Sequence, residues 1–413
     1  MTDVPETCPV SDWATDYDIF DPDYVHDPAP IWDELRMRCP IAHTTRWGGS
    51  WLPTRYDDLQ AMVRMVPALS SRSTAVVPPP PALREQLVAE AKKYGAETPP
   101  ISADPPEHKP FRRMILPFFS PRAVEAQIPY TRALCHSLID GFIAKGEADA
   151  AVDYAQQITP RVIAYVLGID PGRADEFVEW VRGLLELGQT QPAMRIKYRG
   201  VIRDFFKDMV AERRANPGDD PISTLIEAEV EGKKLDDYKI VGVCFLLLVA
   251  GIDTTWSSIS SSLLHFATHP EDQARLRAEP ELLPTAVEEM LRFYAPVTMA
   301  RKVTEPVEIS GVALQPGDKV LMNFPAANRD PAVFDRPDKV VLDRQRNRHI
   351  AFGLGIHRCA GSNLARMEMQ VALHTWFDRI GTFELTHPDS ITWAGGQVRG
   401  PRSVPVRFGA AVC

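Results

Sequence analysis

One cysteine among six lies in a setting that favours metal binding. The cysteines are scattered, without a CxxC pair or a zinc spacing: Cys8, Cys39, Cys135, Cys244, Cys359 and Cys413. Gly353 and Gly355 precede Cys359 in a short loop, and Gly361 follows it just before a strongly helical stretch. Glycines let a backbone turn sharply and approach a flat cofactor without Cβ clashes. A cysteine before a helix N-terminus gains N–H donors and the positive dipole end, which favour a thiolate. These residues therefore predict a ligand for a soft metal or a haem iron, and a buried structural cysteine is the alternative.

A short polar step interrupts the most apolar part of the chain. The sequence Ala250-Gly-Ile-Asp-Thr-Thr255 directly follows the apolar residues 245–249. A glycine and two threonines are unfavourable inside a helix built for burial. Gly251 removes bulk, and a threonine hydroxyl can bond a backbone carbonyl in place of its helix partner and open a groove. The alternative is that these polar residues are a solvent-exposed stretch of a long helix.

Two pairs of polar residues recur at helical spacing. Glu289 and Arg292 are three residues apart on one helix face, a spacing that carries little information by itself because exposed helices are full of such pairs. His108 and Arg112 are four apart at a predicted helix start, so they also share one face.

Helical periodicity predicts most of the elements that must position these groups. Apolar residues recur at three-and-four spacing over about 121–145, 150–167, 172–187, 193–215, 236–268, 282–295 and 361–378. Short strands are predicted at 51–54, 303–309 and 319–322, with a later strand pair at 382–385 and 403–408. Prolines between residues 78 and 106 predict a stiff surface loop around a short charged helix at 84–94. We therefore expect a mainly α protein with small β-sheets, in one domain over residues 1–413.

The overall composition is that of an acidic globular protein. The chain has 413 residues, a net charge of −9 and 45% hydrophobic residues. Nucleic acid as the main partner would demand a basic face. The first residues are acidic and lack the apolar segment of a signal peptide, and the longest apolar run, 240–252, is too short to span a bilayer. We expect a cytoplasmic protein with free thiols that binds neither nucleic acid nor membranes.

The loop around the cysteine resembles the haem-loop signature of the cytochrome P450 family. Six residues match at fixed positions: Phe352, Gly353, Gly355, His357, Cys359 and Gly361. The resemblance extends over essentially the whole chain and implies the cytochrome P450 fold as a single haem domain. It implies that Cys359 binds the iron of haem b (iron protoporphyrin IX) and that Phe352 packs near the sulfur. Backbone N–H groups after the cysteine would then hydrogen-bond the sulfur.

The same resemblance assigns roles to the upstream groups. Thr254 would hold dioxygen at the iron and Asp253 would help to deliver protons, with Ala250 and Gly251 beside the haem. Glu289 and Arg292 would form a buried ion network with Arg336, which supports the haem loop. The haem propionates would be bound by His108, Arg112, Arg301 and His357. The substrate pocket would be formed by Val249, Ala250, Val297, Thr298, Met299, Gln397 and Val398.

The implied function is that of a monooxygenase supplied with electrons by other proteins. Two external electrons would activate O2 to hydroxylate, dealkylate or epoxidise a small to medium apolar or aromatic substrate. The sequence has no glycine-rich flavin or nicotinamide unit and no cysteine set for an iron–sulfur cluster. We therefore expect a ferredoxin and its NAD(P)H-dependent reductase as partners of a monomeric enzyme. Basic residues expected on the cysteine side could steer an acidic carrier: Lys109, Arg112, Arg113, Arg344, Arg346, Arg348, Arg358 and Arg366.

Two other functions compete with this interpretation. A peroxygenase would use H2O2 directly, although such members tend to lack the acid–alcohol step of Asp253 and Thr254. A haem sensor or carrier would bind the cofactor without turnover. The substrate is open, and four basic residues are candidates to pair with a substrate acid: Arg72, Arg195, Lys197 and Arg399.

Overall fold

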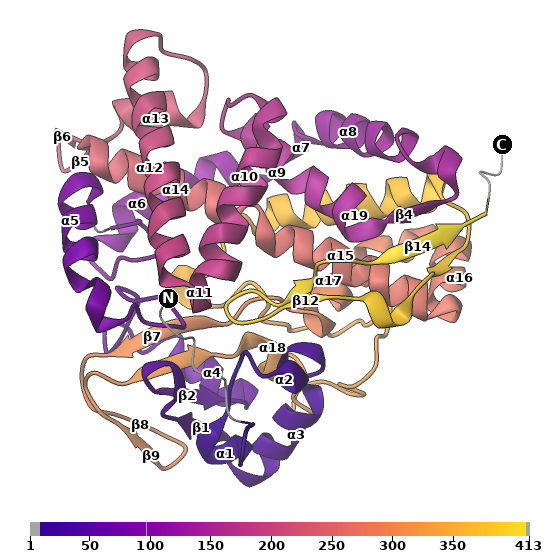
Figure 1. Cartoon of the computed structure of the whole chain (residues 1–413), viewed down its shortest axis with the longest axis horizontal. Helices are drawn as coiled ribbons and strands as arrows, with labels where there is room; N and C mark the ends of the chain where they lie inside the picture. Colours follow the sequence, from indigo (N-terminus) through magenta and orange to yellow (C-terminus); the bar gives the residue numbers. More distant parts are fainter. Residues whose placement is uncertain (1–8, 96, 410–413) are drawn as a thin grey trace.

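A computed structural model describes residues 9–95 and 97–409 of the chain. In Figure 1 a sheet-bearing region lies at the bottom, and a larger helical region fills the top and right. Cys8 and Cys413 lie outside the described residues. Cys39, Cys135, Cys244 and Cys359 have free thiols, as expected for these four.

A five-stranded sheet organises the lower region. Its strand order is β1 (Ile41–Thr44), β2 (Ser50–Pro53), β10 (Lys319–Met322), β7 (Met299–Val303) and β3 (Leu69–Ser70). β1 and β2 form an antiparallel pair, β10 runs parallel to β2, and β7 runs antiparallel to both β10 and β3. Short helices belong to the same region: α1 (Trp13–Asp16), α2 (Pro22–His26), α3 (Ala29–Arg38), α4 (Tyr56–Met62) and α18 (Phe324–Ala327).

The two faces of this sheet belong to different apolar clusters. Leu321 packs with the N-terminal helices α1 to α3, whereas Val320 and Val303 pack with α4. Side chains alternate between the two faces along a strand. Arg301 therefore lies on the face of Val303, and Lys319 lies on the face of Leu321.

Long helices form the upper region and enclose the largest core. They are α8 (Ile128–Asp140), α9 (Gln156–Val166), α10 (Ala174–Arg182), α12 (Pro192–Ala215), α14 (Asp237–Ala250), α15 (Asp253–Thr268), α16 (Pro270–Ala278), α17 (Leu283–Phe293) and α19 (Ser362–Arg379). Trp256, Phe266 and Trp376 are fully buried in this core. Aromatic side chains of this size remove much apolar surface from water, which is the main driving force for packing these helices.

The α14–α15 stretch passes through the centre of that core. Among the described residues, Asp237–Thr268 is the one helical stretch long and apolar enough to cross a membrane, and 78% of its most apolar window is buried inside the protein. Burial to this extent is typical of a helix in the core of a folded protein.

The remaining elements are short. The helices are α5 (Arg84–Tyr94), α6 (His108–Ile115), α7 (Pro121–Glu125), α11 (Gly188–Thr190) and α13 (Pro221–Glu227). A second sheet has the order β11 (Phe383–Leu385), β14 (Pro405–Phe408) and β4 (Glu147–Asp149). Three two-stranded pairs join β5 (Glu229–Val230) to β6 (Lys233–Lys234), β8 (Val307–Ile309) to β9 (Val312–Leu314), and β12 (Trp393–Ala394) to β13 (Gly400–Pro401).

Most of the elements expected from the sequence are confirmed, including the charged helix at 84–94 and the late strand pair. The single strand predicted at 303–309 is wrong, because the chain leaves the sheet between β7 and β8. There the Thr304 N–H donates to the Ala68 carbonyl at 2.8 Å and its hydroxyl donates to the Pro67 carbonyl at 2.9 Å. The continuous helix predicted at 236–268 is divided between α14 and α15, at Gly251 and Ile252.

Candidate haem and oxygen site

The loop before α19 has a backbone that requires glycine at two positions. Gly353 and Gly355 have φ values of 65° and 69°, in the left-handed region that glycine adopts without strain. A Cβ atom added at Gly355 would also lie 3.2 Å from the Val63 carbonyl oxygen. The loop closes where the Cys359 N–H donates to the Phe352 carbonyl at 2.8 Å. These contacts confirm the glycine-framed turn predicted around the cysteine.

The Cys359 sulfur receives favourable contacts, although its burial outweighs them. The Gly361 N–H donates to the sulfur, and Arg112 and Arg358 lie near enough to stabilise a thiolate. Burial nevertheless raises the pKa of the thiol. The side chain remains accessible to small molecules even though protein atoms surround it, so it lines an interior surface. A metal cation bonded to the sulfur would supply the charge that keeps it deprotonated.

Phe352 is held beside the cysteine by a small polar cluster. Its ring lies under the Arg366 guanidinium, with 4.5 Å from the guanidinium carbon to the ring centroid. Arg366 Nε donates to Glu288 Oε1 at 2.5 Å, and His349 Nε2 lies 2.9 Å from Glu288 Oε2. Burial acts to raise the pKa of Glu288, but the hydrogen bonds from Arg366 and His349 lower it to about 2. The cluster therefore anchors the loop through an ionised carboxylate.

A group of cationic and donor side chains converges beside this loop. The rings of His108 on α6 and His357 lie 4.4 Å apart, and His357 Nε2 lies 2.9 Å from Ser71 Oγ. Burial, then Arg301 and His108, lower the pKa of His357 to about 3. Burial also lowers the pKa of Arg301 on β7 to about 10. The fourth predicted member, Arg112, donates to the Arg358 carbonyl.

This donor cluster fits the carboxylates of a haem. Among the described residues, His108 Nε2 is buried without a hydrogen-bond partner, and Arg301 donates to the carbonyl of its neighbour Ala300. The nearest acid, Asp104, is already bonded to Ser70 and Ser71. Buried donors are normally satisfied, and an excess of cationic donors suits an anion. At Gly361 an added Cβ would meet no protein atom within 4 Å, which leaves room there for a flat group.

The junction of α14 and α15 has the groove geometry predicted from its threonines. The Thr254 hydroxyl donates to the Ala250 carbonyl at 3.0 Å, the acceptor that the Thr254 N–H would use in a continuous helix. The Thr159 hydroxyl donates to the Ile252 carbonyl at 3.0 Å, and this carbonyl also accepts the Trp256 N–H at 3.2 Å. A Cβ added at Gly251 would lie 2.8 Å from the Ile163 Cγ1, so close packing against α9 requires the glycine.

Asp253 lies next to Thr254 in sequence, but it is held by a different set of partners. Its Oδ1 lies 2.9 Å from Arg402 Nη2 and accepts from the Ser257 hydroxyl at 3.3 Å. Arg402 Nε also donates to Glu186 Oε2 at 2.9 Å. Burial raises the pKa of Asp253, Arg402 opposes this shift, and Glu186 adds to it. Arg402 and Glu186 could not be predicted as partners of Asp253 from the sequence, because both are far from Asp253 along the chain.

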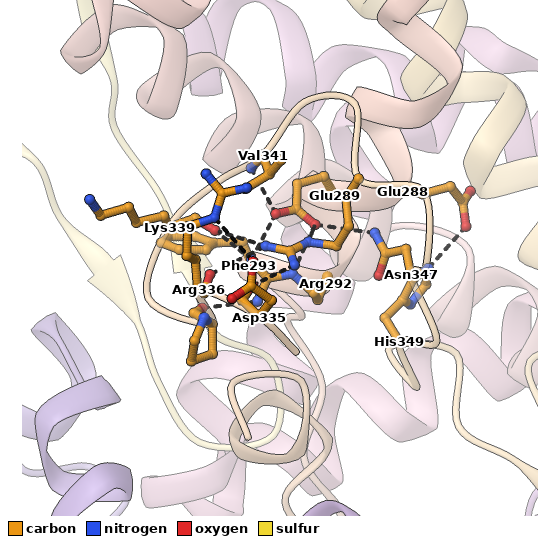
Figure 2. Close-up of polar contacts among 12 residues, drawn as sticks. Glu288, Glu289, Arg292, Phe293, Asp335, Arg336, Lys339, Val341, Asn347 and His349 are labelled. Atoms are coloured by element: carbon orange, nitrogen blue, oxygen red, sulfur yellow. Dashed lines mark hydrogen bonds and ion pairs between the residues drawn. The ribbon is translucent and has the colours of Figure 1, made fainter. Parts of the chain in front are cut away.

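Glu289 and Arg292 form the buried ion pair predicted for α17, and Figure 2 shows them at the centre of the network. Both side chains have 0% exposure, and Arg292 Nη2 lies 2.7 Å from Glu289 Oε1. Arg292 also donates to the carbonyls of Asn328, Pro337 and Lys339.

The third member of this network is Arg344, and the prediction of Arg336 is wrong. Arg344 Nε donates to Glu289 Oε2 at 2.9 Å, and its side chain is 8% exposed. The Arg336 side chain is 60% exposed and pairs with Asp335. Arg336 has a φ of 48°, a left-handed backbone that presents its carbonyl to the Arg344 guanidinium at 3.3 Å.

The predicted pocket residues come from two turns that meet and from the end of α14. Val297 and Val398 form an isolated β-bridge, and the Thr298 N–H donates to the Gln397 carbonyl at 3.0 Å. The Gln397 side chain also approaches Met299 Sδ at 3.4 Å. The other two predicted residues, Val249 and Ala250, close α14; Val249 is buried and Ala250 is exposed.

The basic residues predicted on the cysteine side differ in their surroundings. Arg344 belongs to the buried network and Arg366 is paired with Glu288. The exposed members are Lys109, Arg113, Arg346, Arg348 and Arg358.

Comparisons with known proteins agree with this arrangement. A family model described as Cytochrome P450 matches residues 184–390. The chain is 33% identical over 366 residues to the mycinamicin IV hydroxylase/epoxidase of Micromonospora griseorubida, covering 86% of this chain and 89% of that protein. It is 32% identical to pentalenic acid synthase of Streptomyces avermitilis, covering 93% and 95% of the two chains. The crystal structure of P450BioI, in complex with an acyl carrier protein that carries hexadec-9Z-enoic acid, superposes with a TM-score of 0.84 at 29% identity, covering 94% of this chain and 100% of that chain.

Proposed function

The chain belongs to the cytochrome P450 family and is a haem-thiolate monooxygenase of organic substrates, and from this premise we propose a role for each group in its site. When bound, the haem supplies the activation of O2 with two electrons delivered from outside. We propose that Cys359 would bind the haem iron through its sulfur. The observation that carries this assignment is the Cys359 sulfur itself, which lines an interior surface and accepts the Gly361 N–H.

The donor cluster beside the loop is proposed to bind the haem propionates. His108, Arg112, Arg301 and His357 converge there, and the buried His108 Nε2 lacks a partner among the described residues. A propionate oxygen would accept from that nitrogen and from the Arg301 guanidinium. Phe352 is proposed to pack against the sulfur side of the haem, where Arg366 holds its ring. Gly353 and Gly361 would allow the loop to approach the macrocycle, and Ala250 and Gly251 would lie on its opposite face.

Thr254 and Asp253 are proposed to handle protons on the oxygen side. The Thr254 hydroxyl donates to the Ala250 carbonyl and would have to release that carbonyl before it could donate to another acceptor in the groove. Burial raises the pKa of Asp253, so its carboxyl can hold a proton at a higher pH than an exposed acid does. The ion pair with Arg402 opposes that protonation, so release of this pair would prepare Asp253 to pass a proton towards Thr254.

The substrate is proposed to be a small to medium apolar or aromatic molecule. Its pocket would be formed by the meeting turns at 297–299 and 397–398 together with Val249 and Ala250. Known relatives include enzymes named for a mycinamicin, for pentalenic acid and for a steroid.

The electron donors are proposed to be an acidic ferredoxin and its NAD(P)H-dependent reductase. The chain carries a net charge of −9, yet Lys109, Arg113, Arg346, Arg348 and Arg358 are exposed on segments beside the cysteine loop. Local positive charge of this kind steers an acidic carrier to the face nearest the haem. We further propose that the protein acts as a monomer in the cytoplasm and that residues 1–413 form one haem domain.

Turnover with isotopically labelled O2 tests this function. The holoprotein is combined with a ferredoxin, its reductase and NADPH, and fatty acids, terpenes, steroids and small aromatics are screened for a low-to-high-spin shift. A substrate that shifts the spin state should yield a product with one labelled oxygen atom. Oxygenated product formed with unlabelled H2O2 alone, and none with the ferredoxin system, would indicate a peroxygenase. A haem protein that gives no product under either condition would contradict the proposal.

A further inference from the structure

Two basic side chains from different elements meet on adjacent carbonyls beside the sheet. Arg195 on α12 donates from Nη1 to the Val77 carbonyl, and Lys319 on β10 donates from Nζ to the Val76 carbonyl, both at 3.1 Å. Burial, then the charge of Arg195, lower the pKa of Lys319 to about 8. Burial also lowers the pKa of Arg195. The two cations therefore lie close together in a poorly solvated place.

In the described part of the chain, no carboxylate forms an ion pair with either cation. The nearest acid to Arg195 is Glu90 on α5, whose Oε1 lies 2.7 Å from Arg199 Nε. Arg203, one helical turn further along α12, donates to the carbonyls of Gly95 and Glu97. Charged groups that leave water are normally paired, because desolvation without a partner is costly. Among the described residues, Arg195 and Lys319 thus carry positive charge without a paired carboxylate.

Local contacts place Arg195 at the edge of the proposed substrate pocket. A Cβ added at Gly188 would lie 2.8 Å from the Arg195 Cβ, so α11 and the Arg195 side chain are in close contact. On the same helix, Gln189 Oε1 accepts the Gln397 N–H at 3.0 Å, and Gln397 belongs to the pocket turn. Helix α11 therefore contacts both the Arg195 side chain and the pocket turn at Gln397.

Lys319 approaches the same edge from the sheet. The segment after β3 continues antiparallel to β7, since Leu69 pairs with Val303 and the Ala300 N–H donates to the Thr74 carbonyl. Residues 76 and 77 thus come beside the start of β7 and pack with Ala300 and Leu321, on the face of the sheet that carries Lys319. The pocket residue Met299 is the neighbour of Ala300 along β7 and lies on the opposite face. The carbonyls that hold the two cations belong to this segment.

We propose that Arg195 and Lys319 bind the carboxylate of the substrate, so that the enzyme acts on apolar molecules that carry an acid group. The acid would be held at the edge of the pocket while the apolar remainder enters it. This inference rests on the proposed function, because it assigns the substrate class of the same pocket. The adjacent carbonyls orient both cations, and a bound carboxylate supplies the missing negative charge through charge-assisted hydrogen bonds.

The other basic candidates from the sequence are engaged elsewhere. Arg72 pairs with Glu107, and Arg399 donates to the carbonyls of Val25 and His26 with its guanidinium over the Trp393 ring. Lys197 is exposed and lies over the Tyr198 ring. These contacts single out Arg195 from the four residues.

Matched acids and amides test the proposal on the haem-loaded protein. Dissociation constants are measured by calorimetry and by spin-state shift for dodecanoic acid and para-ethylbenzoic acid, each beside its primary amide. At least one acid should bind about tenfold more tightly than its amide, the gain expected from a charge-assisted contact. Arg195→Gln and Lys319→Gln should remove this preference and leave amide binding unchanged. Arg195→Lys should retain part of it.

Lys302→Gln is the matched control, because Lys302 lies directly opposite Lys319 on β7 and is exposed. It should leave the preference intact. Equal binding of acid and amide by the native protein, failure of both acids to bind, or equal weakening of acid and amide in the variants would overturn the inference. If the reduced CO complex of the native protein shows the spectrum of a thiolate-ligated haem, each of these outcomes counts against the proposed substrate class alone. Absence of that spectrum in the native protein would instead defeat the proposed function.

Discussion

Replacing Glu289 by glutamine should destabilise the protein more than any exposed charge change, because two buried arginines share this carboxylate. Glu289 accepts from Arg292 Nε at 2.8 Å, from Arg292 Nη2 at 2.7 Å and from Arg344 Nε at 2.9 Å. It also accepts the Val341 N–H at 2.8 Å. Figure 2 shows Glu289 between Arg292 and Val341. The Glu289 side chain has 0% exposure.

The magnitude follows from the charge that remains. Glutamine keeps the shape of the side chain but leaves the buried cations without a counterion, and breaking a buried pair in this way costs roughly 3–5 kcal/mol. Most domains have a free energy of unfolding of only about 5–15 kcal/mol, so the loss should be large relative to the total. The loop between α17 and α19 would loosen first, because Val341 and Arg344 both belong to it.

Urea denaturation measures this loss, and two arginine variants show where it arises. Arg344→Gln should lower the free energy of unfolding by about 1.5–3 kcal/mol, the contribution of a hydrogen bond to a charged group. Arg336→Gln should change it by less than about 0.5 kcal/mol, since its side chain is exposed. Equal effects of Arg336→Gln and Arg344→Gln, or a Glu289→Gln protein as stable as the native one, would refute this account of the network.

Three further predictions concern the oxygen side, the loop and the acid site. Thr254→Ala removes the hydroxyl that donates to Ala250, so NADPH should still be consumed but most of it should yield H2O2; unchanged coupling to product would contradict the role of Thr254. Gly355→Ala should lower the free energy of unfolding by about 1–2 kcal/mol or more, because a Cβ is strained at a φ of 69° and meets the Val63 carbonyl, and thermal melting that matches the native protein would disprove this. The affinity for dodecanoic acid should fall as the pH rises through about 8, since Lys319 loses its proton there while Arg195 beside it, with Glu90 nearby, stays charged. Binding that is independent of pH in the native protein, or equally dependent on pH in Lys319→Gln, would exclude Lys319 as the titrating group.

The features that the sequence predicted well are local ones. Glycines at 353 and 355 predicted a sharp turn before Cys359, and both adopt positive φ. The threonines after Ala250 predicted a hydroxyl bonded to a carbonyl, and Thr254 makes that bond. In both cases the relevant partners lie within a few residues, so residue type and spacing determine the geometry.

The features that the sequence did not predict depend on which way side chains point in the folded protein and on which distant segments meet there. Arg336 and Arg344 lie in the same irregular segment, but the Arg336 side chain is exposed whereas the Arg344 side chain is buried against Glu289. The partners of Asp253 come from distant parts of the chain, Glu186 and Arg402, and no periodic pattern connects them. The meeting of Lys319 with Arg195 is likewise invisible without the contacts of both side chains with the carbonyls of Val76 and Val77, because each cation alone resembles an ordinary surface residue.

The absorption spectrum of the reduced CO complex tests the central claim most directly. The native protein should show the far-red-shifted Soret band of a thiolate-ligated haem, and the same band should appear in Cys39→Ser, whose thiol lies far from the loop in sequence. Cys359→His should lose the band while it still binds haem. A native protein that binds haem without this band, or a Cys359→His variant that retains it, would contradict the assignment of Cys359 as the ligand.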